Sequence, residues 1–426
     1  MRILLISSQP KSHSANLGED LMEALRLNGH DVDFIHHSFY NVTHKLSFFE
    51  RLRRSLRKKK SRLNIKFKRF LHRYPFTPND DIKLVNIDER HPMIDAKGLL
   101  SKIQYKYDLV ISLFCEDMIN SNTFERLYKK LSCPILIYAV DMAPITGGCF
   151  YFMHCTNYQS GCGNCPIYGG IYKRDQTHLN WLHKRRIFNS IPCYFLGNSW
   201  MLAHAQKSNL FAPERLKYAL MPINENLFKP VDRVEARKTL NIGTEKRFVI
   251  FAGASMILEK RKGFAELRQS LKIFSDSLTT EEKSNVVIIF AGNINNDLQS
   301  FFDIDVIQTG FLSTNQLITA YSAADVFLSP SLGDAGPTMV NQSVMCGTPV
   351  VAFSTGIAID IIENGGAGYV AKMKDVEDFA RGIRYIYDIV GTSGYRELRE
   401  NSRKIAEEKC SIRAVSAQID TIIKEL

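Results

Sequence analysis

Short apolar runs alternate with helix-length amphipathic segments along this chain. Most of the runs are β-branched and apolar throughout, which is typical of parallel strands covered on both faces. The segments between them space their apolar positions as helices do. The expected strands are Ile3–Ile6, Asp31–Ile35, Leu109–Leu113, Ile135–Val140, Tyr194–Leu196, Phe248–Ala252, Val286–Phe290, Val326–Leu328 and Val350–Ala352. The expected helices include Asn16–Leu27, Thr123–Lys130, Lys262–Phe274, Asn315–Ser322 and Val376–Val390.

Repeated β-α units of this kind predict doubly wound α/β sheets. The pattern restarts near residue 248, after the loop MPINENLFKPVDR. We therefore expect two Rossmann-like domains, residues 1–228 and 229–426, that face each other across a cleft, with the last helix able to pack back on the N-terminal domain. The carboxyl ends of the two sheets meet at such a cleft, where α/β proteins usually bind ligands.

Composition adds an expectation about location. The chain has 426 residues, of which 45% are apolar, as in ordinary packed proteins. No apolar stretch approaches the roughly 18 to 20 residues needed to span a bilayer. The N-terminal run MRILLISSQP is read as a first strand rather than a signal peptide. We expect a cytoplasmic protein, with a peripheral position on the inner face of the cell membrane left open.

The stretch from Asp334 to Pro337 is the first candidate site. It would form the loop after one expected strand and lead into a helix that starts at Thr338. The first turn of a helix has free N–H groups and a partial positive charge, which favour phosphate. Gly336 lets the backbone approach a ligand closely, and Pro337 suits a first helical position. The alternative is a tight β-α loop that binds nothing.

The stretch DAGPTMVNQSVMCGTPVVAF resembles the signature of the family 4 (group 1) glycosyltransferases, which have the two-domain GT-B fold. That signature has two acids separated by seven residues, followed by a Gly-Thr-Pro-Val-Val strand. The acids match Asp334 and Gln342 here. The resemblance implies that Asp334 and the loop amides up to Thr338 hold a donor sugar. Gln342 could bond the nucleotide ribose without charge, which would weaken donor binding by roughly 1 kcal/mol.

The stretch FAGASMILEKRKGFAEL is similar to the first strand and the phosphate site of the family's donor domain. The resemblance implies roles in donor binding for Gly253 and for Lys262, whose Lys-Gly pair would open a helix. The family's usual Arg is missing after Gly253, and Arg261 is the candidate to supply its charge. A solvated helix start is the alternative for Arg261 and Lys262.

The stretch YAVDMAPITGGC resembles a segment of family members that make surface polysaccharides such as capsule or exopolysaccharide. The family's active-site His falls on Val140. That departure leaves Asp141 as the nearest polar group and as a candidate catalytic residue. The alternative for Asp141 is a capped turn at the end of a strand.

Four cysteines, Cys149, Cys155, Cys162 and Cys165, lie within seventeen residues. The Cys-Gly-Asn-Cys knuckle places two thiolates on one tight turn, as in half of a tetrahedral zinc site. We expect a structural zinc ion that stiffens a loop facing the acceptor, with His154 as a substitute ligand. The alternative is four reduced cysteines without metal.

The net charge of +11 is local, because residues 51–69 hold eleven Lys and Arg and no acid. Within residues 46–71, apolar residues recur at intervals close to those of a helix, with basic residues between them. This pattern is typical of an amphipathic basic segment. Such a segment binds anionic membrane surfaces, although nucleic acid or a solvated insertion would also account for it. Membrane binding is favoured because the family resemblance implies a lipid-linked acceptor.

Together with these residues, the family resemblance implies a retaining glycosyltransferase of hexosyltransferase type. It would move a sugar from a nucleotide-sugar donor to a glycan acceptor, lipid-linked, without a catalytic divalent metal and without nucleic acid. Val140 and Gln342 keep open a second hypothesis, a catalytically degraded GT-B protein that acts as a partner subunit. The four cysteines and the basic run motivate a third, a zinc-containing nucleic-acid-binding protein, which leaves the β-α units unexplained.

Overall fold

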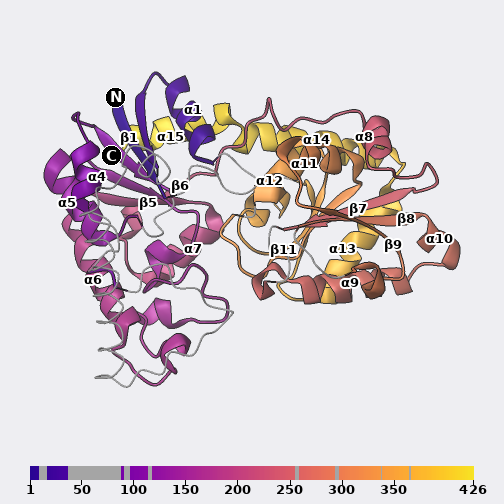
Figure 1. The fold of residues 1–426 in the computed structure, drawn as a ribbon, viewed down its shortest axis with the longest axis horizontal. Helices are drawn as coiled ribbons and strands as arrows, with labels where there is room; N and C mark the ends of the chain where they lie inside the picture. Colours follow the sequence, from indigo (N-terminus) through magenta and orange to yellow (C-terminus); the bar gives the residue numbers. More distant parts are fainter. Residues whose placement is uncertain are drawn as a thin grey trace, which may run out of the picture.

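A computed structural model places the chain in two α/β domains (Figure 1). It describes residues 1–8, 17–36, 88–90, 96–113, 118–254, 259–292, 297–336, 338–363 and 366–426. The basic segment 46–71 and Pro337 lie outside these residues. Among the helices described, none combines the length and apolarity needed to cross a membrane.

The N-terminal domain is built on a six-stranded sheet in the order β2-β1-β3-β4-β5-β6. All neighbouring strands in it are parallel. The central strands β3 and β4 are buried along their whole length, as their apolar sequences predict. The strands are β1 (Arg2–Ser7), β2 (Asp31–His36), β3 (Leu109–Ser112), β4 (Ile135–Tyr138), β5 (Cys193–Gly197) and β6 (Leu216–Tyr218).

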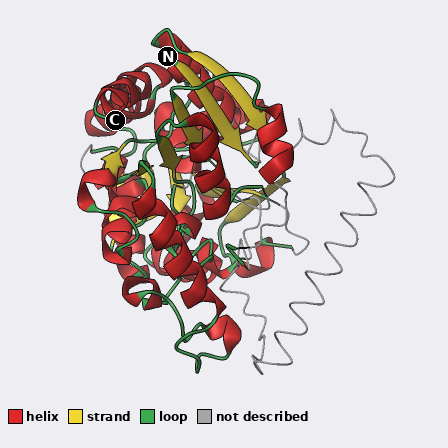
Figure 2. Ribbon diagram, turned by 90° about the vertical axis from the view of Figure 1, so that its left-hand side faces the viewer, coloured by secondary structure: helices red, strands yellow, loops and turns green. Residues whose placement is uncertain are grey.

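Helices pack around this sheet (Figure 2), and its central strands are buried between two apolar clusters. The α-helices are α1 (Leu17–Leu27), α4 (Ala96–Lys102), α5 (Ser121–Leu131), α6 (Gln176–Ser190) and α7 (Ser199–Ser208). One-turn 3₁₀ helices form at Ala143–Ile145, Asn157–Ser160, Pro166–Tyr168 and Pro213–Arg215. The first three of these lie in the long connection from β4 to α6, which carries the four clustered cysteines.

The C-terminal domain repeats the architecture with a sheet in the order β12-β11-β10-β7-β8-β9. Its neighbouring strands are all parallel. The strands are β7 (Phe248–Gly253), β8 (Val286–Ala291), β9 (Asp305–Gly310), β10 (Val326–Ser329), β11 (Val350–Phe353) and β12 (Gly368–Ala371). The two sheets confirm the expected pair of Rossmann-like domains.

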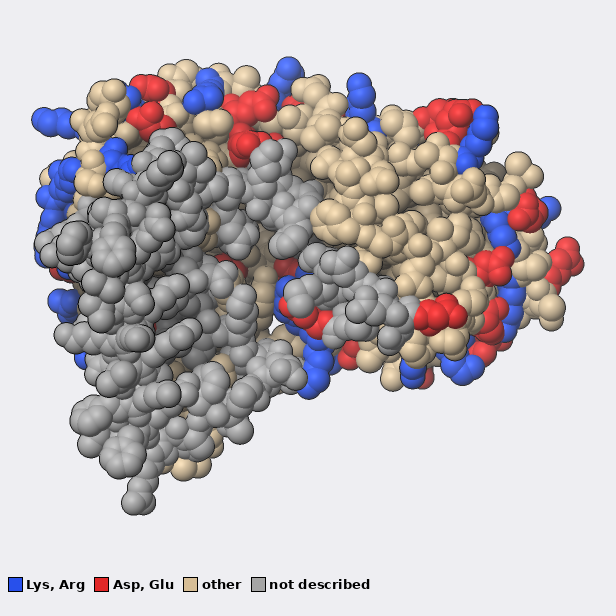
Figure 3. Space-filling model, viewed as in Figure 1, with Lys and Arg blue, Asp and Glu red and all other residues tan. Residues whose placement is uncertain are grey.

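Both faces of the second sheet are covered. On one face lie α9 (Phe264–Asp276) and α13 (Val376–Ile389). The other face carries α8 (Arg233–Thr239), α11 (Thr314–Ala323), α12 (Thr338–Met345) and α14 (Ser393–Cys410), as Figure 1 shows. Shorter helices are α10 (Thr280–Ser284), the π-helix Ile359–Glu363 and the 3₁₀ turns Lys260–Lys262 and Gln299–Phe301. On the face seen in Figure 3, charged side chains of both signs lie along the edges of this domain.

The last helix, α15 (Ile412–Lys424), leaves the C-terminal domain and packs against α1 of the other domain (Figure 1). Its apolar side chains join the core beneath the first sheet. The Ser416 hydroxyl donates to the carbonyl of Ala24 at 2.6 Å. The two segments that cross between the domains lie side by side, because Ile223 N–H donates to the Cys410 carbonyl at 2.8 Å.

Asp20 on α1 lies beside this double crossing. It is 6% exposed, and a backbone hydrogen bond links it to Asn224. Burial, together with the negative charges of Glu23 and Glu225, raises its pKa to about 7. The folded protein therefore holds a proton on Asp20 at pH values where the unfolded chain, with a pKa of about 3.9, does not.

Stability should thus fall as pH rises from about 4 to about 7, because the folded state binds the extra proton in this window. We predict that Asp20→Asn, which cannot titrate, gains stability over the wild type at pH 8 but not at pH 4. The gain should be on the order of 1–3 kcal/mol. Melting temperatures across the pH range test this, with the exposed Asp276→Asn as control. Parallel wild-type and Asp20→Asn curves would contradict it.

Gly263 fixes the start of α9 against the end of β10. Its φ is +68°, and a Cβ atom there would lie 1.9 Å from the carbonyl oxygen of Pro330. Only glycine combines this backbone conformation with so close an approach.

We predict that Gly263→Ala lowers stability by about 1–3 kcal/mol more than Gly29→Ala. Gly29 is the matched control, since its φ is +74° but a Cβ atom there meets nothing within 4 Å. Both variants bear the cost of the left-handed conformation, and only the first adds the clash. Calorimetry of both variants measures the difference, and equal losses would refute the close approach.

Candidate functional site

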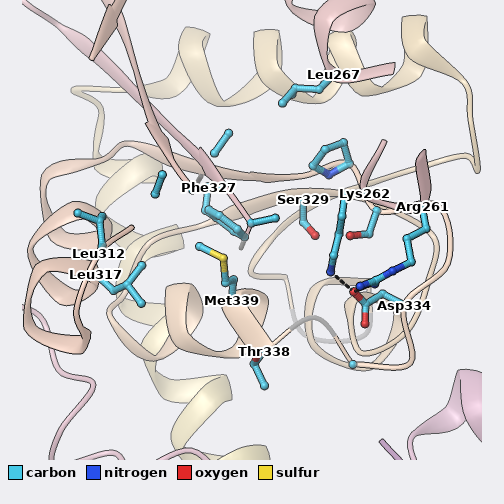
Figure 4. Close-up of a pocket in the computed structure, with 18 of the residues that line it drawn as sticks. Arg261, Lys262, Leu267, Leu312, Leu317, Phe327, Ser329, Asp334, Thr338 and Met339 are labelled. Atoms are coloured by element: carbon cyan, nitrogen blue, oxygen red, sulfur yellow. Dashed lines mark hydrogen bonds and ion pairs between the residues drawn. The ribbon is translucent and has the colours of Figure 1, made fainter. Parts of the chain in front are cut away.

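A pocket opens in the C-terminal domain at the carboxyl ends of β7, β8 and β10, beside the start of α12 (Figure 4). Parallel α/β sheets place their ligand sites at this edge. Gly253 and Gly292 line it at the ends of β7 and β8, where a Cβ atom on either would collide with the backbone that follows or ends the neighbouring strand. Gly336 and Thr338 line it at the start of α12.

Asp334 lies at the centre of the charged side of this pocket. Its carboxylate oxygen Oδ2 is 2.5 Å from Lys262 Nζ and 3.2 Å from Arg261 Nη1 (Figure 4). Burial would raise the pKa of this carboxyl, but the charges of Lys262 and Arg261 hold it below its usual range. The backbone of Gly336 also hydrogen-bonds the carboxylate. Asp334 is therefore ionised, and its carboxylate accepts hydrogen bonds from both cations and from the backbone of Gly336.

Arg261 is held on three sides. Its Nε lies 2.8 Å from Glu259 Oε2, and the ring of Tyr151 stands 4.4 Å from its guanidinium carbon. Burial opposes its charge, but Asp334, Tyr151 and Glu259 together raise its pKa. The backbone of the same residue accepts from Leu332 N–H at 2.8 Å, which joins the α9 loop to the loop after β10.

The structure thus brings together most of the sequence-predicted donor residues. Gly253, Arg261, Lys262, Asp334, Gly336 and Thr338 all line the one pocket. Pro337 lies outside the described residues.

Gln342 is not among the residues that line this pocket. Its side chain is fully buried on α12, where its Oε1 accepts from the Tyr321 hydroxyl at 3.1 Å. A ribose contact from Gln342 would require this buried arrangement to change.

Asp141 also lies outside the pocket lining. It is 4% exposed, and its Oδ1 accepts from the backbone N–H of Ala143 at 2.7 Å. This contact fits the capped turn that the sequence left as the alternative, and the catalytic role of Asp141 stays a prediction. Val140 beside it packs against the core of the N-terminal domain.

The four clustered cysteines converge on a second, small pocket in the N-terminal domain. Cys149, Cys155, Cys162 and Cys165 all line it, together with Thr177 from α6. Asp175 caps α6 and accepts from Cys165 N–H at 2.8 Å, which fastens the cysteine segment to that helix.

The zinc prediction is not supported by this geometry. In the described ranges, no three His, Cys, Asp or Glu side chains are arranged so that they could hold a metal ion. Cys162 Sγ instead accepts from Gly147 N–H at 3.1 Å, and burial raises the pKa of Cys162 above its usual range. Burial likewise raises the pKa of Cys149 to about 11. His154, the expected substitute ligand, lies outside the cysteine pocket and contacts Lys374 at 2.7 Å.

Two aromatic residues of the pocket were not anticipated from the sequence. Phe311 follows β9 and is half exposed at the pocket, and Tyr151 comes from the other domain. No local pattern marks either of them as a site residue, because each reaches the pocket through tertiary structure alone.

The chain is similar in sequence to known glycosyltransferases. Residues 232–409 match the family model described as glycosyl transferases, group 1. A segment of 253 residues is 26% identical to the sulfoquinovosyl transferase SQD2 of Arabidopsis thaliana, covering 57% of this chain and 47% of that protein. A segment of 237 residues is 22% identical to WcaC of Escherichia coli K12, named as a candidate colanic acid biosynthesis glycosyl transferase, covering 54% and 55%. The chain thus matches about half the length of these curated relatives.

A solved structure extends the likeness to the whole fold. The Anabaena protein HepE in complex with UDP superposes with a TM-score of 0.62 and 14% identity, over 100% of both chains. The two facing sheets and this likeness identify the fold as GT-B. Residues 232–409, which match the model of the group 1 glycosyl transferases, hold nearly all of the pocket.

Proposed function

We propose that this chain is a retaining glycosyltransferase that transfers a sugar from a nucleotide-sugar donor to a glycan acceptor. The observation that carries the proposal is the buried cluster of Lys262, Arg261 and Asp334 at the carboxyl edge of the C-terminal sheet. It lies inside the segment that matches the group 1 family. The UDP complex of the similarly folded HepE supports a nucleotide-sugar as donor.

The reaction is substitution at the anomeric carbon. The bond from that carbon to the diphosphate oxygen breaks, a bond to the acceptor oxygen forms, and the acceptor proton passes to the departing diphosphate. Negative charge therefore grows on the diphosphate in the transition state. Lys262, Arg261 and the amides at the start of α12 can stabilise this charge, because the folded chain already holds these groups at the pocket.

Asp334 has a different part in this reaction. Without ligand, Asp334 and Glu259 balance the charges of Lys262 and Arg261. A bound diphosphate would compete for both cations and release the Asp334 carboxylate. The carboxylate would then accept hydrogen bonds from hydroxyls of the donor sugar, which is the role that the family resemblance implies.

The N-terminal domain is the proposed acceptor side. The similarity of this chain to E. coli WcaC, which is named as a candidate colanic acid biosynthesis glycosyl transferase, supports an acceptor in surface polysaccharide biosynthesis. A lipid-linked acceptor and a peripheral position at the membrane remain part of the proposal through segment 46–71.

A partner subunit without catalysis is the second candidate, and two observations favour it. Val140 stands where the family has its active-site His, and Gln342 is buried away from the pocket. Turnover separates the two candidates, since a partner subunit would bind nucleotide-sugar without transferring the sugar.

We predict that one class of nucleotide-sugar raises the melting temperature of the protein. A ligand present at 100 times its Kd should add about 2.7 kcal/mol to the free energy of unfolding. Thermal-shift screening against uridine, guanosine and adenosine diphosphate-sugars tests this, with the free sugars as controls. If the whole panel leaves the melting temperature unchanged, the donor pocket is wrongly assigned.

We predict that Lys262→Ala and Asp334→Ala each lower kcat/KM for transfer by at least about 100-fold. The first variant loses a cation that stabilises the negative charge on the departing diphosphate. The second loses the carboxylate that accepts hydrogen bonds from the sugar hydroxyls. Lys272→Ala is the matched control, because this exposed lysine lies on α9 outside the pocket and pairs only with Asp276 among the described contacts. Circular dichroism verifies folding, and wild-type rates in both variants would refute the site.

A further inference from the structure

One loop of the N-terminal domain, residues 149–165, crosses to the donor pocket, and we name it the Cys-rich loop. It meets the C-terminal domain at three places. The Tyr151 ring stands 4.4 Å from the Arg261 guanidinium carbon, and His154 Nε2 lies 2.7 Å from Lys374 Nζ. Met153 Sδ lies 3.4 Å from where a Cβ atom on Gly333 would stand. The loop is thus seated against the rim of the pocket.

Tyr151 is the innermost of these contacts. Of the described residues that line the donor pocket, it alone comes from the N-terminal domain. Burial raises the pKa of its phenol above the usual range, so the side chain is neutral at any physiological pH. A neutral ring against a desolvated guanidinium makes a stronger cation–π contact than the same pair in water.

Arg261 needs such a support to act on a ligand. Its Nε is engaged by Glu259 and its Nη1 by Asp334. When an incoming diphosphate displaces Asp334, the guanidinium loses one of its two carboxylate partners. The contact of Tyr151 with one face of the guanidinium then determines the orientation of this planar group. The orientation matters because a guanidinium binds two phosphate oxygens at once only when its N–H groups are aligned with them.

We propose that Tyr151 is a positioning residue of the donor site, which holds Arg261 in place for the donor diphosphate. This inference rests on the proposed function. It follows that the donor site is assembled from both domains, with the Cys-rich loop as the wall that the N-terminal domain supplies. The cysteine pocket and the Asp175 contact to Cys165 fasten the base of that wall to α6.

The test compares Tyr151→Ala and Tyr151→Phe in the full chain. Binding of uridine and guanosine diphosphate is measured by calorimetry, and donor KM, acceptor KM and kcat are measured with the donor that the thermal-shift screen identifies. The matched control is Tyr105→Ala, because Tyr105 stacks on Arg2 at 3.5 Å and does not line the pocket.

We expect Tyr151→Ala to weaken nucleoside diphosphate binding and to raise donor KM by about tenfold. Acceptor KM should stay within twofold, and Tyr151→Phe, which keeps the ring, should restore most of the donor affinity. Tyr105→Ala should bind like the wild type. A merely structural role for Tyr151 would lower the active fraction, and hence kcat, without changing the Kd for the nucleotide.

Unchanged nucleotide affinity in Tyr151→Ala, with a wild type that binds and transfers, would overturn this inference and leave the proposed function standing. A wild type that binds neither diphosphate and transfers no sugar would overturn both. Equal loss of affinity in Tyr151→Ala and Tyr151→Phe would assign the effect to the hydroxyl, and so would also refute the role of the ring.

Discussion

The pocket of the C-terminal domain depends on the burial of one carboxylate, Asp334, between two cations. A carboxylate that loses its water shell is stable as an anion only if charges and hydrogen bonds replace the water. Here Lys262, Arg261 and the Gly336 backbone supply them. The contacts join the loop before α9 to the loop before α12, so the same interactions that neutralise Asp334 also shape the walls of the site. With Glu259, which pairs with Arg261, Asp334 balances the two cations before any ligand enters. Under the proposed function, an anionic donor must therefore displace existing ion pairs.

Most of the fold was readable from the sequence because the interior strands of both sheets are buried on both faces. Strands such as β3, β8 and β10 are continuous apolar runs that no exposed element would carry. The strands that the sequence did not predict, β6, β9 and β12, are all end strands of their sheets, and their residues are mostly half exposed. An edge strand needs less apolar sequence, so its pattern resembles that of a loop.

The site was predictable as far as it is local in sequence. Lys262 with Gly263 comes just before α9, and Asp334 with Gly336 comes just before α12. Residue types that suit phosphate at a helix start can be recognised from the local sequence. Tyr151 could not be found in this way, since its partner Arg261 belongs to the other domain. The cysteines show what local spacing cannot predict. Their spacing predicted that they lie close together, and they do share a pocket. Spacing does not determine the directions of the thiols, and within the described residues these thiols do not form a set of metal ligands.

The chain passes between the domains twice, and the passages run in parallel at Ile223 and Ser411. A single tether would let the lobes swivel and twist about each other in any direction. Two adjoining tethers resist twisting and leave bending about one axis as the easy movement. Opening of the cleft would then lift the loop that carries Tyr151 along a fixed arc, so substrate entry and the separation of Tyr151 from Arg261 would be the same mechanical event.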